Sequence, residues 1–170
     1  GIDTINLGNN DNDTDIVLFS SVLALGDTVS DFEVGDDLVH FNDSLNAEYD
    51  DLININNFAF ATGNGADGGT TAANLNTVEA LLLGGTGGEG VSTADLGNAA
   101  LVAAEFNSEF TITAGVGQDA LLVVNDTSGN SFALWQYVEA GGAEMQASEV
   151  TLIGIFSADG NATTANFDFS

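Results

Sequence analysis

The chain has 170 residues, of which 26 are Asp or Glu and none is Lys or Arg, so its formal net charge is −26. An all-acidic chain repels a phosphate backbone, which excludes nucleic acid as a partner, and no apolar run is long enough for membrane insertion. The absence of Cys excludes disulfides and thiolate metal sites, and 44% hydrophobic residues exclude a disordered acidic tail.

The first stretch, residues 1–60, alternates apolar residues with Asp, Asn, Thr and Gly, which predicts short β-strands separated by turns. A polar loop at Asn9–Asp15 precedes the first strongly apolar run, and the next two runs each follow a Gly-Asp pair that favours a turn. The strands are predicted at Ile16–Phe19, Gly26–Phe32, Gly35–Phe41 and Asp51–Phe60.

The middle stretch, residues 61–106, is rich in Gly and less regular. It contains two Gly-rich loops, at residues 62–71 and 84–90. A short Leu-rich helix is predicted over Asn76–Leu83. A longer helix is predicted over Ser92–Phe106, because Ser92 and Asp95 have the spacing of a capping box and an apolar stripe follows. We expect this stretch to be an insertion in the β structure.

The last stretch, residues 107–170, returns to β patterns, with a hairpin loop at Asn125–Asn130. Its strands are predicted at Glu109–Thr113, Ala120–Val124, Ser131–Val138 and Val150–Phe156. The chain is therefore predicted to be a single, mainly β domain. We expect a short β-roll-like or sandwich sheet of antiparallel strands with a Gly-rich, partly helical insertion.

The charge predicts a bound cation. No Lys or Arg is available to pair with the 26 carboxylates, so their mutual repulsion opposes the compact state. Cations must come from solution, and a surface rich in oxygen ligands suits Ca²⁺. The Asn9–Asp15 loop consists mostly of Asn and Asp with no Lys or Arg near, which favours calcium binding, although such residues also favour solvated turns without a metal.

Three regions resemble a known family. Gly1–Asn9 is similar to a degenerate copy of the Gly- and Asp-rich nonapeptide of RTX proteins, in which a Gly-x-Asp turn binds Ca²⁺ and the next apolar residue fills a parallel β-roll. Asp27–Phe32, read as Asp-Thr-Val-Ser-Asp-Phe, and Gly35–Phe41 resemble the segment that closes RTX arrays in type I secreted proteins. Ala120–Asp126 and Glu149–Gly154 are similar to the region downstream, which carries an uncleaved secretion signal in that family.

The resemblance implies calcium ligands in the first stretch. Together with the acidic loop, it gives a candidate ligand set of Asp3, Asn9, Asp11, Asp13, Asp15, Asp27, Asp31, Asp36 and Asp37. Two features depart from the family: the tandem nonapeptides are nearly absent, and the insertion at residues 61–106 has no counterpart. The family further implies an extracellular or cell-surface protein exported by type I secretion.

Catalysis is not expected. There is no Cys nucleophile, no Lys or Arg, and one His, His40, which lies between Val39 and Phe41 on a predicted strand and is interpreted as a strand residue. Trp135 and Tyr137 are likewise interpreted as strand packing rather than a sugar-binding platform.

The expected function is a secreted, calcium-binding structural protein that self-associates into a surface layer, matrix or filament. Its subunits would meet through apolar edge strands such as Ile16–Phe19 or Val150–Phe156. Two alternatives are a calcium-dependent adhesin or lectin-like module that binds a glycan or cell surface, and the secretion and folding cap of a larger RTX protein.

Overall fold

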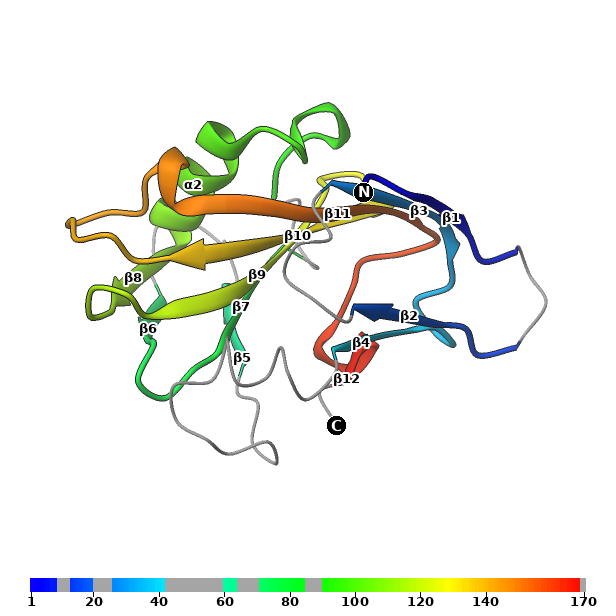
Figure 1. Ribbon diagram of the computed structural model, residues 1–170, viewed down its shortest axis with the longest axis horizontal. Helices are drawn as coiled ribbons and strands as arrows, with labels where there is room; N and C mark the ends of the chain where they lie inside the picture. Colours follow the sequence, from blue (N-terminus) through cyan, green and yellow to red (C-terminus); the bar gives the residue numbers. More distant parts are fainter. Residues whose placement is uncertain (9–12, 20–25, 42–59, 64–70, 85–89, 169–170) are drawn as a thin grey trace.

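The computed structural model describes residues 1–8, 13–19, 26–41, 60–63, 71–84 and 90–168. It is mainly β and is built in three layers (Figure 1). A seven-stranded sheet forms the middle layer, a three-stranded sheet covers one face, and a helix with a two-stranded sheet covers the other. The predicted mainly β class is confirmed.

The elements have the following bounds. In spatial order, the seven-stranded sheet contains β1 Thr4–Asn6, β3 Asp27–Phe32, β11 Val150–Ala158, β10 Ser131–Val138, β9 Asp119–Asn125, β7 Ala80–Leu83 and β5 Phe60–Gly63. The three-stranded sheet contains β12 Phe167–Asp168, β4 Leu38–Phe41 and β2 Ile16–Phe19, and the two-stranded sheet contains β6 Thr71–Asn74 and β8 Phe110–Thr113. The helix is α2 Ala99–Glu109, and 3-10 turns cover Thr93–Asp95, Ala147–Glu149 and Thr164–Asn166.

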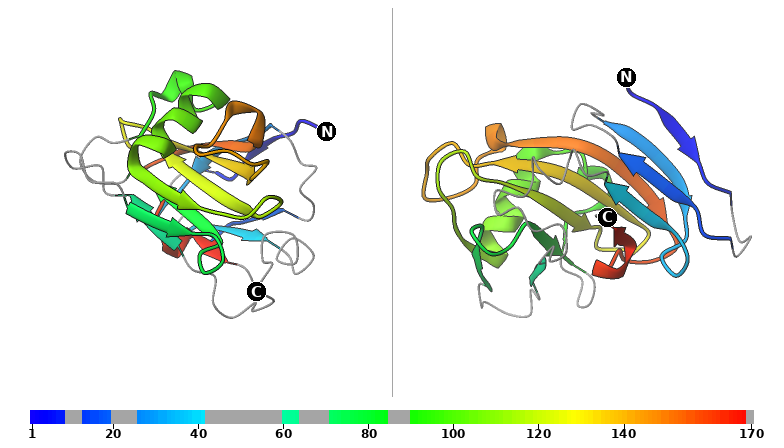
Figure 2. Two further views of the ribbon diagram at one scale, coloured as in Figure 1. Left: turned by 90° about the vertical axis from the view of Figure 1, so that its left-hand side faces the viewer. Right: turned by 60° about the horizontal axis from the view of Figure 1, so that its bottom comes forward.

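Six of these strands form a short parallel β-roll (Figure 2, right view). The row β1–β3–β11 lies in the large sheet, the row β2–β4–β12 lies in the small sheet, and every pairing in both rows is parallel. We call β1 with β2 the first coil, β3 with β4 the second coil, and β11 with β12 the third coil. The third coil comes from the far end of the sequence, so the two ends of the chain complete one structure.

The central strands β7 and β9 of the middle layer are buried on both faces. Along β9, Leu121 and Val123 pack in the core beneath the three-stranded sheet, whereas Leu122 and Val124 pack in the core beneath α2. Strands buried on both faces have continuous apolar runs rather than alternating ones. Stacked aromatic rings add to the packing of the core beneath the three-stranded sheet: the ring centroids of Phe132 and Phe156 lie 4.4 Å apart, with an interplanar angle of 9°.

The strand directions differ from the expected antiparallel sheet. Among the strands of the described residues, only β9–β10 and β10–β11 are antiparallel, and the other seven pairings are parallel. Val150–Phe156 is a strand, β11, as predicted, but its expected position at a sheet edge is wrong, because β11 pairs with β10 on one side and with β3 on the other. Ile16–Phe19, by contrast, is β2, an edge of the three-stranded sheet.

The middle stretch also differs from the prediction. The predicted helix at Asn76–Leu83 is wrong, because a turn at residues 75–77 leads into β7, which pairs with β9 inside the large sheet. The second helix starts later than Ser92: the side chain of Asn98 caps α2 by accepting hydrogen bonds from the backbone N–H groups of Ala100 and Leu101. The stretch therefore contributes the strands β5 and β7 to the large sheet in addition to the helix α2. The predicted strand Asp51–Phe60 lies outside the described residues except for Phe60.

Candidate functional site

The turns at one end of the β-roll gather several of the predicted ligands. Ile16 pairs with Leu38, so Asp15 and Asp37, which precede them, are neighbours in adjacent coils. The Asp37 side chain is 3% exposed, and its two carboxylate oxygens accept hydrogen bonds from backbone N–H groups, Oδ1 from Asp15 at 3.0 Å and Oδ2 from Glu33 at 2.8 Å. The buried carboxylate is thus stabilised by backbone dipoles and joins the first coil to the second.

The opposite end of the same coils repeats the arrangement. Thr4 pairs with Thr28, so Asp3 and Asp27 are neighbours. Asp27 is 5% exposed, and its Oδ1 accepts a hydrogen bond from the Asp3 backbone N–H at 2.8 Å. Each of these two Asp residues in the second coil therefore binds a backbone N–H of the coil before it.

Asp31 has a different role. It is the one described residue other than Gly with a positive φ, at 63°, and it lies where the β3–β11 register shifts between Phe156 and Ala158. Asp tolerates the left-handed region better than most residues, which suits this irregular position. Its Oδ2 accepts a hydrogen bond from Asn6 Nδ2 at 2.6 Å.

The structure assigns positions to seven of the nine predicted ligands. Asp27, Asp31 and Asp37 accept the hydrogen bonds given above, while Asp3, Asp13 and Asp36 are exposed and Asp15 is half-buried. Asn9 and Asp11 lie outside the described residues. Within the described ranges, no three His, Asp or Glu side chains come together to hold a metal ion. Calcium ligation by these residues stays a prediction.

Two residues of the third coil close the end of the roll that holds Asp37, and neither was predicted from the sequence. Asp159 Oδ1 accepts a hydrogen bond from the Val34 backbone N–H at 2.8 Å. Asn166 Nδ2 donates to the backbone carbonyls of Val34 at 2.7 Å and Asp37 at 3.2 Å. The local signal for Asn166 was available, because it forms a capping box with Thr163, but its partners are about 130 residues away in the sequence.

The remaining singled-out residues have structural positions. His40 lies on β4 as predicted, and its Nδ1 is 3.3 Å from Asp168 Oδ2 on β12. Trp135 and Tyr137 are 3% and 1% exposed on β10, which confirms their interpretation as strand packing.

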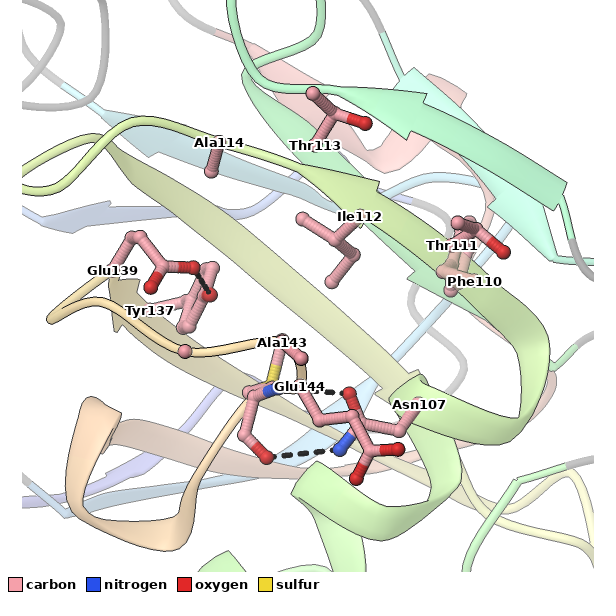
Figure 3. A pocket seen from close by; sticks show the side chains of 12 residues that line it. Asn107, Phe110, Thr111, Ile112, Thr113, Ala114, Tyr137, Glu139, Ala143 and Glu144 are labelled. Carbon is pink, nitrogen blue, oxygen red and sulfur yellow. Dashed lines mark hydrogen bonds between the residues drawn. The ribbon is translucent and has the colours of Figure 1, made fainter.

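A pocket of about 390 Å³ lies between β8 and the loop that follows β10 (Figure 3). At its wall, the Tyr137 hydroxyl donates a hydrogen bond to Glu139 Oε2 at 2.5 Å. Burial raises the pKa of the Tyr137 hydroxyl far above its ordinary value, and the Glu139 carboxylate adds to the shift. Asn107 of α2 holds the loop by exchanging two hydrogen bonds of 2.9 Å with the Met145 backbone. These contacts make the pocket wall a packed element of the fold.

A third buried carboxylate, Asp126, organises the hairpin loop after β9. It is 2% exposed and accepts hydrogen bonds from the hydroxyls of Thr93 and Ser128 and from the Asn130 backbone N–H. Burial raises the pKa of Asp126, but these hydrogen bonds outweigh it, so the pKa lies below its ordinary value.

The lowered pKa of Asp126 predicts acid sensitivity. A group with a depressed pKa in the folded state stabilises the fold above its unfolded pKa, about 3.9 for Asp, and this contribution is lost as the pH falls through the folded pKa. Urea unfolding at pH 6, 4 and 3 should show a flatter acid dependence for Asp126→Asn than for the wild type. The exposed Asp36→Asn variant is the control and should retain the wild-type dependence. Equal slopes for Asp126→Asn and the wild type would contradict the prediction.

No protein family, curated protein or solved structure is matched by the chain. None of the helices in the described part is long and apolar enough to cross a membrane.

Proposed function

We propose that the chain is a secreted, calcium-binding structural protein of the bacterial exterior that assembles into a surface layer, matrix or filament. The three-coil parallel β-roll carries the proposal. Both of its sheets end at the first coil, where β1 and β2 are edge strands. Unpaired strand edges are templates for pairing with another chain, and in this protein two of them lie together at one end of the roll.

The net negative charge of the chain is the reason that the proposal includes calcium. Copies of a chain with net charge −26 repel one another, so any close association requires cations from solution. The available donors are carboxylate, amide and backbone oxygens, the ligands that Ca²⁺ prefers. The exposed Asp13 and Asp36 lie in the stacked turns beside Asp15, which makes this end of the roll the region we propose for binding.

Export before folding is part of the same proposal. The third coil requires residues 150–168, so the roll cannot close until the C-terminal part of the chain is present beside the first two coils. We propose that repulsion among the carboxylates keeps the chain open where calcium is scarce, and that external calcium completes the roll after type I secretion. In this proposal the protein is non-catalytic.

The open first coil also favours a second candidate function, that of a secretion and folding cap for a larger RTX protein. In that case β1 and β2 would receive further coils of the same roll. A cap of this kind would remain monomeric as an isolated chain, which separates it from the assembling subunit.

Calcium-dependent assembly is tested by static light scattering and negative-stain microscopy of one sample in millimolar CaCl₂ and in excess EDTA. We expect ordered particles in calcium and their loss on chelation. MgCl₂ at the same concentration is the matched control, because it supplies equal charge but dehydrates less readily and demands stricter geometry. Monomers in calcium at every protein concentration would refute the assembling function and leave the cap.

A further inference from the structure

The open end of the β-roll leaves one row of core residues incompletely covered. Ile5, Val29 and Phe156 are neighbours in adjacent strands of the large sheet. Val29 and Phe156 are fully buried, whereas Ile5, in the first coil, is half-buried although it packs on the same core. Among the described strands, β1 is the edge of the large sheet, so no described coil covers Ile5.

At the open end of the roll, the backbone N–H and C=O groups of alternate residues face outward. The Asp3 carbonyl and the Leu7 N–H both bind β3, and since a parallel ladder repeats every second residue, the polar groups of Thr4 and Asn6 face the open side. In the small sheet, the Asp15 carbonyl accepts from the Leu38 N–H, so by the same rule Ile16 and Leu18 direct their backbone groups outward.

We propose that the first coil is the interface of an isologous dimer, in which a second copy of this chain continues both sheets; this inference rests on the proposed assembling function. A two-fold axis perpendicular to the sheets sets β1 antiparallel to the partner's β1 and β2 antiparallel to the partner's β2. Outward-facing residues then form the hydrogen-bonded pairs, and Ile5 and Val17 lie on the axis opposite themselves. Both residues point into the same core, so one rotation closes both sheets and covers the half-buried Ile5.

Two features allow a second copy of this chain to pair at this face. The strands themselves, Thr4–Asn6 and Ile16–Phe19, carry no charge in a chain with 26 carboxylates, so nothing in them blocks pairing. In this register the two copies of Asp3 lie four residues apart along the strands, about 14 Å, which exceeds the screening length of about 10 Å at 0.1 M salt.

The outer face of the small sheet adds an apolar contact. Ile16 and Leu18 are 59% and 57% exposed. In the dimer each Ile16 lies directly beside the partner's Leu18, which joins two exposed apolar pairs into one cross-strand cluster. In the dimer, β1 would therefore pair on both sides, with β3 in parallel within its own chain and with the partner's β1 in antiparallel direction.

The first test uses the absence of Cys in the chain. In calcium, Ile5→Cys should form a covalent dimer on mild oxidation, because residues opposite each other in a non-hydrogen-bonded pair have Cα atoms about 4.5 Å apart, within the disulfide range. Val116→Cys, 77% exposed in the loop between β8 and β9, is the control and should cross-link at least tenfold more slowly. Equal rates for the two variants would overturn the dimer.

The second test blocks the edge without a cross-link. Thr4→Pro removes an outward N–H that makes no bond within the chain's own ladder, and by symmetry the dimer loses two hydrogen bonds; Thr4→Ala, which keeps the N–H, is the control. We expect the dimer dissociation constant to rise about tenfold or more for Thr4→Pro only, measured by sedimentation in calcium. An unchanged constant would refute the interface. Calcium-dependent particles that form without Ile5 cross-linking would refute the dimer alone, whereas cross-linked dimers without larger calcium-dependent particles would refute the assembling function alone.

Discussion

Replacing Asp37 with alanine is expected to lower the free energy of unfolding by about 2–6 kcal/mol, because it removes the side-chain acceptor of two partly buried backbone donors at about 1–3 kcal/mol each. The donors are the N–H groups of Asp15 and Glu33, and the Asp15 bond joins the first coil to the second. The loss should therefore also loosen the first coil. Urea unfolding, with hydrogen exchange at the β2 amides, measures both effects.

The neighbouring Asp36→Ala is the matched control. It removes the same charge one residue away, but Asp36 is exposed, so its effect should stay within about 0.5 kcal/mol. Both variants should be measured in EDTA. If Asp37→Ala were harmless in EDTA and destabilising only in calcium, the carboxylate would act through a metal rather than through the backbone donors.

The sequence was sufficient where local chemistry determines the structure. The Gly-Asp turns located β3 and β4, and the loop Asn125–Asn130 located the β9–β10 hairpin. Asp27 and Asp37 were predicted as calcium ligands from the resemblance, and their hydrogen bonds to backbone N–H groups of the first coil and the second were not foreseen. Their observed partners are backbone N–H groups, because in a chain without Lys or Arg these are the most abundant donors available to a buried carboxylate.

The rest depended on contacts distant in sequence. Nothing local to Val150–Phe156 indicates that β11 lies beside β3, and parallel pairing leaves no hairpin turn as a signal. The Leu-rich segment Asn76–Leu83 predicts a helix, but a short, continuous apolar run has no period that separates a helix from a strand buried on both faces, and Ala80–Leu83 is the strand β7. Asp159 and Asn166, which close the roll, were not predicted because their hydrogen-bond partners lie far away in the sequence.

Calcium is expected to raise the melting temperature by about 5–11 °C when its concentration is a hundredfold above the dissociation constant. Binding to the native state alone contributes about 2.7 kcal/mol at that excess, and each kcal/mol shifts the melting temperature of a chain of this size by about 2–4 °C. Part of the gain comes from relief of repulsion among 26 carboxylates, which any cation provides. Calorimetry in EDTA, CaCl₂, MgCl₂ and NaCl of matched ionic strength separates the two contributions.

The part of the melting-temperature shift that is specific to calcium should depend on the stacked turns of the roll that hold Asp13 and Asp15. The double variant Asp13→Asn, Asp15→Asn keeps the side-chain size but removes two negative charges, so it should bind calcium more weakly and lose much of the calcium-specific shift. The Asp15 carbonyl and N–H that link the first two coils belong to the backbone and are retained in this variant. A melting temperature equal in EDTA and calcium for the wild type would refute calcium stabilisation altogether. An unchanged calcium affinity and stoichiometry in the double variant would exclude only Asp13 and Asp15 as ligands, because the remaining carboxylates would then bind the ion.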